Sequence, residues 1–259
     1  MKLSIITTSF NSEKTIGDTI KSVLAQNYPD IEHIFIDGGS TDGTLEIVKK
    51  YESEYKSSGR TTKVISEKDA GMYDAMNKGI GLATGDIIGI LNSDDFYASN
   101  NVIETVVNEF EKSGLGDTGA DCVWGDLVYV DRSDTDKVVR TWKSSSYVTG
   151  SFQKGWHPPH STFFVKKWVY EKYGVFRTDL STSADYELML RFIEKNRVSS
   201  SYIPQIFVKM RVGGASNKSY WRWIKANFGC YKAFKLNGLK INASFVFRKP
   251  LSKLGQFIK

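Results

Sequence analysis

The sequence has 259 residues, of which 41% are hydrophobic and 25% are charged, with a net charge of +6. This composition is ordinary for a soluble protein that buries one large core. No run is long and apolar enough to span a bilayer, and a strand predicted from Lys2 onward leaves no place for a signal peptide. Cys122 and Cys230 lie far apart in the sequence, which predicts free thiols rather than a metal site or a disulfide.

The first half of the chain alternates predicted strands with predicted amphipathic helices. Strands are expected at residues 2–8, 32–37, 63–66, 86–91 and 121–130, and helices at residues 12–26, 44–55, 73–83 and 100–112. This alternation predicts an α/β fold in which helices flank both faces of a mostly parallel sheet. Ligands of such sheets bind at the carboxyl ends of the strands, so the residues that follow each strand are the first candidates for a site.

Polar clusters follow four of these strands, at residues 7–11, 37–42, 67–71 and 92–95. Asp94 and Asp95 are adjacent and come directly after an apolar strand. Two buried carboxylates there would be costly unless a cation lay beside them, and a divalent metal bridged to a diphosphate would supply one. The alternative is a polar loop that caps the next helix. Four polar strand ends together favour a nucleotide and a metal.

The glycine-rich stretch at residues 38–44 does not match a known phosphate-binding fingerprint. It lacks the G-x-G-x-x-G spacing of dinucleotide-binding folds and the lysine of a phosphate loop. It therefore reads as a turn with a helix cap at Asp42. Asp37, at the end of the preceding strand, is the functional candidate in this region.

These motifs together resemble the inverting nucleotide-sugar glycosyltransferases of family 2, which have the Rossmann-like GT-A fold. The resemblance covers roughly residues 1 to 215 and rests on the segments 4–11, 36–44, 67–79, 91–95, 157–164 and 183–187. The segment 67–79 is similar to a subgroup that works on bacterial surface polysaccharides such as capsule, O-antigen and lipopolysaccharide.

The resemblance implies a role for each matching position. Asp95 would bind Mn²⁺ or Mg²⁺, and Asp185 would be the general base. The nucleotide and the donor sugar would be contacted by Thr8, Phe10, Asn11, Asp37, Asp69 and Asp94. Two positions depart from the family pattern: Gly38 replaces a second Asp that commonly contacts uracil, and Asn92 replaces the first Asp of the metal motif.

The chemistry of glycosyl transfer supports these roles. A cation stabilises the departing diphosphate, and a single carboxylate suffices as the base of an inverting displacement. Asp185 begins a predicted helix, so a plain helix cap is the alternative for it. Glu187 is the next candidate base. His157 and His160, two of the three histidines of the chain, are candidates for contact with the acceptor, the donor or the metal.

The end of the chain has a different composition. Between Lys209 and Lys259 there are many Lys and Arg residues and neither Asp nor Glu, and aromatic residues alternate with the basic ones. We therefore predict a catalytic domain at residues 1–215, with a nucleotide-binding half to about residue 98 and an acceptor half from about residue 99, and a helical extension at residues 216–259. The extension would contact an anionic membrane or pack against the domain or a second subunit. Nucleic-acid binding is disfavoured because no recognised module accompanies the charge.

The sequence thus predicts a metal-dependent inverting glycosyltransferase that moves a sugar, hexosyl or N-acetylhexosaminyl, from a nucleoside-diphosphate sugar, expected to be UDP-linked, to a glycan or lipid-linked acceptor. A sugar nucleotidyltransferase and a non-catalytic glycan-binding or scaffold protein are the alternatives. The expected location is the cytoplasm, at the inner face of the cytoplasmic membrane.

Overall fold

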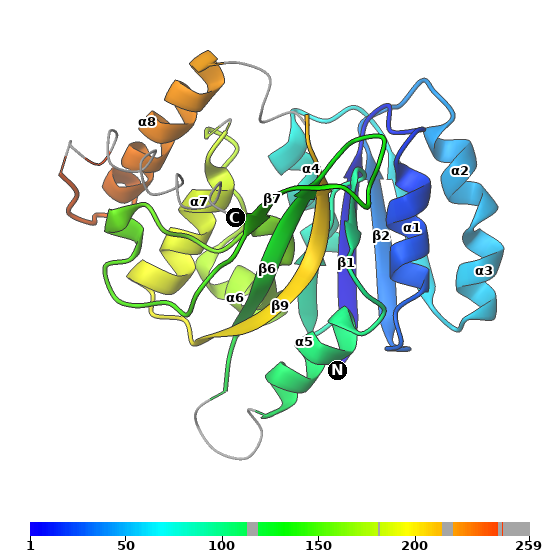
Figure 1. Ribbon diagram of the computed structural model, residues 1–259, viewed down its shortest axis with the longest axis horizontal. Helices are drawn as coiled ribbons and strands as arrows, with labels where there is room; N and C mark the ends of the chain where they lie inside the picture. Colours follow the sequence, from blue (N-terminus) through cyan, green and yellow to red (C-terminus); the bar gives the residue numbers. More distant parts are fainter. Residues whose placement is uncertain (113–118, 181, 214–219, 243–244, 246–259) are drawn as a thin grey trace.

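The computed structural model describes residues 1–112, 119–180, 182–213, 220–242 and 245 (Figure 1). One curled sheet crosses the molecule in the strand order β3-β2-β1-β4-β8-β6-β9-β5, and β7 pairs with β6 outside this path. Its strands are β1 (Leu3–Ser9), β2 (Ile31–Asp37), β3 (Thr61–Ser66), β4 (Ile87–Ile90), β5 (Asp95–Tyr97), β6 (Cys122–Val130), β7 (Val138–Trp142), β8 (Phe164–Lys166) and β9 (Ser200–Arg211).

The amino-terminal half of the sheet is parallel, as predicted. β2 pairs with β1 and β3, and β1 pairs with β4, always in parallel. Every residue of β1 and β2 is buried, which is typical of central parallel strands covered on both faces. The other half is mixed: β8 is antiparallel to β4 and β6, and β5 is antiparallel to β9, while β6 and β9 are parallel.

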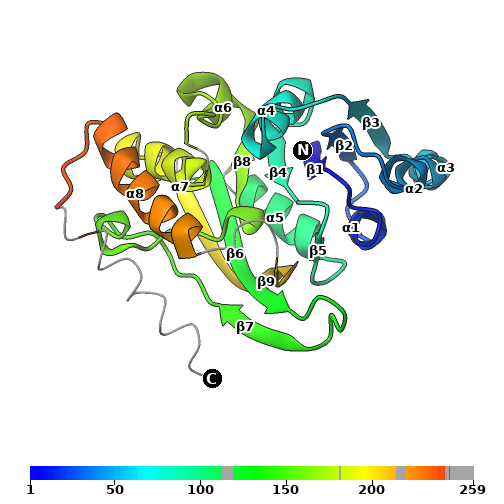
Figure 2. The same cartoon turned by 90° about the horizontal axis from the view of Figure 1, so that it is seen from above.

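Helices cover both faces of the sheet (Figure 2). One apolar cluster lies beneath α1 (Ile16–Leu24), α2 (Thr44–Lys50), α3 (Glu52–Ser57) and α5 (Val102–Glu111). The other lies beneath α4 (Met72–Leu82), α6 (Lys167–Tyr173), α7 (Ala184–Met189) and α8 (Tyr220–Leu236). A π-helical turn at Leu190–Lys195 continues α7, and two 3₁₀ turns, Phe152–Lys154 and His160–Thr162, lie in the connection between β7 and β8.

The predicted elements of the first half are present, with two kinds of difference. The helix expected at residues 44–55 is divided at Tyr51 into α2 and α3. Strands β5, β7, β8 and β9 were not expected. Three of them are three to five residues long, and β9 contains Pro204, which interrupts a strand pattern in sequence. Cys122 and Cys230 are buried and do not form a disulfide, as predicted.

The described part of the carboxyl-terminal extension packs against the acceptor half. Gly229 lies so close to Ser183 that a Cβ there would come within 1.9 Å of the serine Oγ. Phe234 and Phe245 are buried and contact the ring of Tyr186, and Asn237 is buried beside Glu187. The described part of the extension therefore joins the core through Asn227, Cys230, Phe234, Asn237 and Phe245, whereas the aromatic and basic residues at 220–224 and 246–259 lie outside the described side chains. Among the described residues, no helix combines the length and the hydropathy needed to cross a bilayer.

Candidate active site

The turn between β4 and β5 presents Asp95 at the carboxyl end of the sheet. Asp95 is 1% exposed, and one of its carboxylate oxygens, Oδ2, accepts hydrogen bonds from Asn92 Nδ2 and Ser161 Oγ, each at 3.1 Å. From the opposite side, the Thr19 hydroxyl of α1 donates to the Asp95 carbonyl at 2.7 Å. Three segments that are distant in sequence therefore fix the position of this carboxylate.

The charge of Asp95 is poorly compensated by the surrounding protein. Its other carboxylate oxygen, Oδ1, is buried and has no hydrogen-bond partner among the described residues, and the same holds for Asn92 Oδ1. Burial, followed by the charge of neighbouring Asp94, raises the pKa of Asp95 to about 8. A buried carboxylate with a raised pKa and an unsatisfied oxygen is the environment that a bound cation would stabilise.

Arg211, at the end of β9, holds the adjacent part of the turn. Its Nη1 donates to the Asp94 carbonyl at 2.9 Å, its Nη2 pairs with Asp18 of α1 at 2.5 Å, and its guanidinium lies 4.8 Å from the Phe96 ring centroid. Burial raises the pKa of the Asp94 carboxyl, although the positive charges of Arg132 and Arg211 oppose the shift. Arg211 therefore joins the last long strand to the aspartate pair.

A second group of predicted residues meets at the ends of β1 and β2. Phe10 is 63% exposed, which is unusual for a phenylalanine beside a core strand. A Cβ placed on Gly38 would lie 3.2 Å from Asp69 Oδ2 and 3.5 Å from the Phe10 ring. The absence of a side chain at Gly38 thus lets the Asp69 carboxylate approach the exposed aromatic face. Lys78 of α4 binds the other oxygen of Asp69 at 2.6 Å and also pairs with Glu67 and Asp74.

Asp37, by contrast, is turned into the protein. It is 1% exposed and accepts hydrogen bonds from five donors, namely the Ser9, Ser40 and Ser66 hydroxyls and the backbone N–H groups of Gly39 and Ser40. Burial favours a higher pKa for Asp37, but these bonds outweigh it and lower the pKa. The contacts of Asp37 join the ends of three strands, and its predicted place in the nucleotide pocket stays a prediction.

The other two residues predicted at this end of the sheet have similar positions. Thr8 is buried within β1. Asn11 has a positive φ of 49°, and its backbone N–H and side-chain oxygen bind Ser40 and Thr41. Asn11 therefore shapes the loop beside Phe10 and connects it to the glycine-rich turn.

Asp185 lies in the first turn of α7 and meets residues from two other elements. Its Oδ1 accepts a hydrogen bond from the Tyr73 hydroxyl of α4 at 3.2 Å. The Phe176 ring stacks on Tyr73 at 5.6 Å and is met edge-on by His160 at 5.5 Å. Burial lowers the pKa of His160, and the negative charge of Asp185 opposes that shift. His160 directly precedes Ser161, so one 3₁₀ turn connects the surroundings of Asp185 to Asp95.

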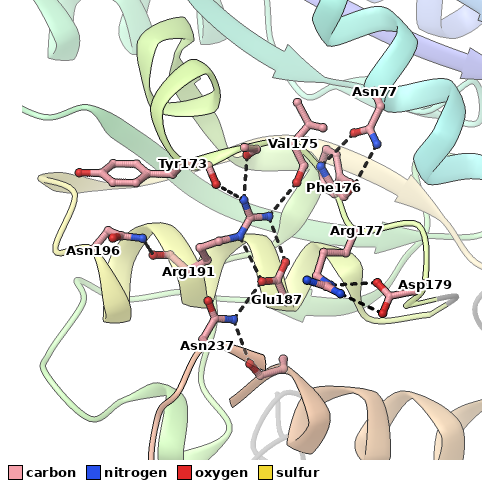
Figure 3. A network of polar contacts seen from close by, with 12 residues as sticks. Asn77, Tyr173, Val175, Phe176, Arg177, Asp179, Glu187, Arg191, Asn196 and Asn237 are labelled. Atoms are coloured by element: carbon pink, nitrogen blue, oxygen red, sulfur yellow. Dashed lines mark hydrogen bonds and ion pairs between the residues drawn. The ribbon is translucent and has the colours of Figure 1, made fainter. Parts of the chain in front are cut away.

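His157 and Glu187 have packing contacts instead of open surroundings. His157 is buried between the rings of Trp142 and Tyr186, with centroids 5.0 and 5.3 Å away. Glu187 is 1% exposed and binds Arg191 through both carboxylate oxygens, at 3.1 and 3.0 Å, and Asn237 at 2.9 Å (Figure 3). These contacts give both side chains a structural role, and their contact with the acceptor or donor stays a prediction.

The structure therefore brings the predicted residues into two neighbouring clusters. Phe10, Gly38 and Asp69 form one, and Asp94, Asp95 and Asp185, with His160, form the other. A hydrogen bond of 2.7 Å between the Ser12 and Ser93 hydroxyls connects the loop after β1 to the aspartate turn. The sequence analysis had assigned no role to four residues that position these clusters, namely Tyr73, Lys78, Ser161 and Arg211. The first three lie inside motifs that had been recognised, whereas no local signal marked Arg211.

The described residues contain no group of three or more His, Cys, Asp or Glu side chains placed to hold a metal ion. A metal held by the protein alone would need more ligands than Asp95 provides. A metal shared with a diphosphate would not, because the phosphate oxygens and water complete the coordination shell. The unsatisfied oxygen of Asp95 fits such a shared site.

Known proteins resemble this chain in sequence. The family model described as glycosyl transferase family 2 matches residues 4–171. An uncharacterized glycosyltransferase of Mycobacterium tuberculosis is 33% identical over 196 residues, covering 73% of this chain and 68% of the relative. The putative teichuronic acid biosynthesis glycosyltransferase TuaG of Bacillus subtilis is 33% identical over 146 residues, covering 56% of this chain and 55% of TuaG.

Solved structures share the fold at low sequence identity. Residues 1–349 of TarS from S. aureus, in complex with UDP, superpose with a TM-score of 0.62 at 16% identity, covering 91% of this chain and 72% of that one. The mannosyltransferase PcManGT from Pyrobaculum calidifontis, in complex with GDP-Man and Mn²⁺, gives a TM-score of 0.66 at 18% identity, covering 98% and 70%.

The sheet and its curled mixed half match the GT-A fold of solved glycosyltransferase structures, which confirms the fold class predicted from sequence. With a family model matching well over half of its length, the chain belongs to glycosyl transferase family 2.

Proposed function

We propose that this protein is a metal-dependent inverting glycosyltransferase that takes a hexosyl or N-acetylhexosaminyl group from a nucleoside-diphosphate sugar. The proposed donor is a UDP-sugar. The acceptor would be a glycan or a lipid-linked glycan in the synthesis of a bacterial surface polysaccharide. The observation that carries the proposal is the buried Asp95, whose one unsatisfied oxygen lies at the carboxyl end of the sheet. A non-catalytic scaffold would have no use for a carboxylate that costs stability in this way.

The relatives support the choice of donor and pathway. TuaG is named for teichuronic acid biosynthesis, and a 26% identical relative from Mycobacterium bovis is named for PGL/p-HBAD biosynthesis. The structural neighbours include TarS with UDP-GlcNAc as well as the GDP-Man complex of PcManGT. The carboxylate of Asp69, beside Phe10, suits a base that presents an N–H group, which uracil and guanine both do.

The residues would divide the reaction between them. A divalent metal on Asp95 would neutralise the charge that develops on the departing diphosphate. Phe10 would stack against the base, and Asp94 would contact the ribose or the donor sugar. Asp185 would take the proton of the acceptor hydroxyl as its oxygen attacks the anomeric carbon from the face opposite the diphosphate. One base and no protein nucleophile give inversion of configuration.

A donor screen tests this proposal. The purified chain is incubated with UDP-Glc, UDP-Gal, UDP-GlcNAc or GDP-Man in Mn²⁺, in Mg²⁺ and in excess EDTA, and released nucleoside diphosphate is measured. We expect release from at least one donor, dependent on metal and abolished by Asp95→Ala. Undiminished release in EDTA would contradict the metal assignment. Formation of a nucleoside triphosphate from pyrophosphate would support the nucleotidyltransferase instead, and glycan binding without turnover would support the scaffold.

We further propose that the exposed face of α8 contacts the anionic inner face of the cytoplasmic membrane, where a lipid-linked acceptor would lie. Lys225, Phe228, Lys232, Lys235 and Leu236 are exposed at helical spacing on this face, opposite the buried Asn227, Cys230 and Phe234. Each basic side chain near an anionic surface contributes about 1 kcal/mol. Because the other face of α8 belongs to the core, a truncation before it would test folding as well as binding.

Charge reversal on the surface avoids that ambiguity. Lys225→Glu combined with Lys235→Glu is expected to reduce sedimentation with vesicles containing anionic lipid, most clearly at low salt. The matched control is Lys49→Glu combined with Lys50→Glu, which reverses two exposed lysines on α2 at the other end of the molecule. Equal loss in both variants would indicate a general charge effect, and no binding by the unmodified chain at low salt would remove the membrane proposal.

A further inference from the structure

We propose that Tyr73 is a positioning residue for the general base: its hydroxyl holds one oxygen of Asp185, so that the other oxygen is left to take the proton of the acceptor. The inference rests on the proposed function, because it assigns a partner to the base of that reaction. It concerns a residue of α4, 112 positions away in sequence from the carboxylate that it contacts.

The direction of the hydrogen bond follows from the surroundings of the Tyr73 hydroxyl. An ionised carboxylate has no proton to donate, so the phenol hydroxyl must supply the proton of this bond. The phenolic proton is therefore directed to Asp185 Oδ1, at 3.2 Å. Burial, followed by the negative charge of Asp185, raises the pKa of Tyr73, so the hydroxyl keeps its proton over the range in which an enzyme works. Tyr73 can thus orient the carboxylate but does not compete with it as a base.

The ring of Tyr73 is held in place by Phe176, which stacks on it with an interplanar angle of 20°. Phe176 is positioned by its backbone: its N–H donates to Asn77 Oδ1 and its carbonyl accepts from Asn77 Nδ2, both at 2.9 Å (Figure 3). Asn77 lies one helical turn after Tyr73 on α4. The same helix therefore carries the tyrosine and the side chain that fixes the ring stacked against it.

The chain just before Phe176 is fixed in the same manner. Arg191, in the π-helical turn after α7, donates to the carbonyls of Tyr173, Gly174 and Val175 (Figure 3). Gly174 has a φ of +86°, and a Cβ there would lie 3.1 Å from Arg191 Nη1. Glu187 orients the guanidinium from α7 itself. The backbone of residues 173–176 is thus held by the side chains of Arg191 and Asn77. The Phe176 ring at the end of this segment stacks on Tyr73 and fixes its position.

This construction has a consequence for the reaction. During transfer the acceptor O–H bond breaks as its oxygen bonds to the anomeric carbon, the bond from that carbon to the diphosphate oxygen breaks, and the proton moves to Asp185. A carboxylate that rotates freely would place an oxygen near the acceptor for only part of the time. One fixed oxygen removes that freedom before the acceptor binds, which lowers the barrier through orientation.

The test is Tyr73→Phe, which removes the hydroxyl and keeps the ring stacked on Phe176. We expect kcat for transfer to fall about 10- to 100-fold, the size expected for one hydrogen bond to a charged group, with KM for the donor changed less than about 2-fold. The matched control is Tyr55→Phe. It removes another buried hydroxyl, bonded to His33 at 2.5 Å in the other apolar cluster, and should lower stability without changing kcat of the folded enzyme.

A double-mutant cycle separates this inference from the function on which it rests. If Tyr73 acts through Asp185, Tyr73→Phe should have no further effect on kcat in the Asp185→Asn background. Full kcat in Asp185→Asn would overturn the assignment of the base itself. A large loss in Asp185→Asn together with wild-type kcat in Tyr73→Phe would overturn only the positioning role, as would fully additive losses in the double variant.

Discussion

Two carboxylates with equal burial lie at opposite ends of the same sheet, and their surroundings differ. Glu32, near the amino end of β2, and Asp95, after the carboxyl end of β4, are each 1% exposed. Glu32 accepts hydrogen bonds from the Ser4 hydroxyl and from the backbone and hydroxyl of Thr84, and it pairs with Lys63 at 3.0 Å. Asp95 has two donors on one oxygen and none on the other among the described residues.

The pKa values of the two groups move in opposite directions because Glu32 has more donors and because the Asp95 carboxylate lies deeper in the protein. Burial alone would raise the pKa of Glu32, but the bonds from Ser4, Thr84 and Lys63 outweigh it and lower the pKa to about 2. Burial and the charge of Asp94 raise the pKa of Asp95 to about 8. A buried carboxylate thus marks a ligand site only where the protein leaves its charge unmatched. Asp37, with five donors, belongs with Glu32 in this respect although it lies at the same end of the sheet as Asp95.

The largest expected effect is on activity. Asp95→Ala should reduce sugar transfer by more than about 10³-fold, because the developing charge of the diphosphate would lose its metal. Glu32→Gln should keep near-normal kcat per folded molecule, since it lies at the opposite end of the sheet. Initial rates at saturating donor and metal measure both. Comparable activity losses in the two variants would break the distinction between the two ends.

The second effect is on stability and has the reverse pattern. Glu32→Gln should lower the free energy of unfolding by about 1–3 kcal/mol, since Lys63 and the donors around it lose a charged partner. Asp95→Asn should leave the metal-free protein equally stable or more stable, because the folded chain no longer has to protonate a buried carboxylate that is ionised in the unfolded chain. Urea unfolding at pH 7 in EDTA measures the free energy of unfolding of both variants. A strongly destabilised Asp95→Asn would contradict the prediction.

The third effect is the dependence of stability on pH. A raised folded-state pKa means that the folded protein binds the proton more tightly than the unfolded chain. The contribution of Asp95 to stability therefore declines as the pH rises from about 4 toward about 8. The lowered pKa of Glu32 has the opposite sign: its contribution is present above about pH 4 and is lost as the pH falls toward about 2. The melting temperature of the metal-free chain, measured as a function of pH, should fall both toward pH 8 and toward pH 2.

The variants Asp95→Asn and Glu32→Gln, and the addition of metal with nucleotide, show which carboxylate causes each part of the pH dependence. Asp95→Asn should flatten the decline between about pH 4 and pH 8 and leave the loss below about pH 4, and Glu32→Gln should do the reverse. Mn²⁺ with nucleoside diphosphate should offset the decline toward pH 8 in the unmodified chain but not in Asp95→Asn. If that decline persists unchanged in Asp95→Asn, it belongs to another group.

The smallest expected effect concerns Ser161. Ser161→Ala removes one of the two donors to Asp95 Oδ2, which leaves the carboxylate less fixed and less readily ionised. We expect the metal concentration for half-maximal activity to rise about 3- to 10-fold, with kcat at saturating metal nearly unchanged. A metal titration of the rate measures this, and Ser146→Ala, at an exposed serine remote in sequence from the aspartate turn, serves as the control. An unchanged titration would mean that Asn92 alone orients Asp95.

The parallel half of the fold could be predicted from the sequence, because apolar strands, amphipathic helices and polar strand ends are local patterns and parallel sheets bring those ends together. The polar strand ends indicated Asp37, Asp94 and Asp95 as site residues. The resemblance to family 2 implied Thr8, Phe10, Asn11, Asp69 and Asp185, and all these assignments stay predictions. Strands β5, β7, β8 and β9 were not predicted, because three of them are short and β9 contains Pro204. They also lie outside the regular strand–helix alternation that predicted the parallel strands.

Which buried carboxylates have enough hydrogen-bond donors to balance their charge became visible only in the folded structure. Asp37 ends one buried strand in the sequence, and Asp95 follows another. The Asp37 carboxylate accepts hydrogen bonds from five donors, whereas the Asp95 carboxylate accepts them from two. The difference depends on Ser9, Ser40 and Ser66 on one side and on Ser161 and Arg211 on the other, which reach the carboxylates or their turn from other elements. The same holds for Tyr73 on Asp185 and for α8, whose buried face is visible only where it meets α7. The sequence shows that a residue is polar. Whether its charge is balanced by hydrogen bonds and opposite charges depends on neighbours that come together only when the chain folds.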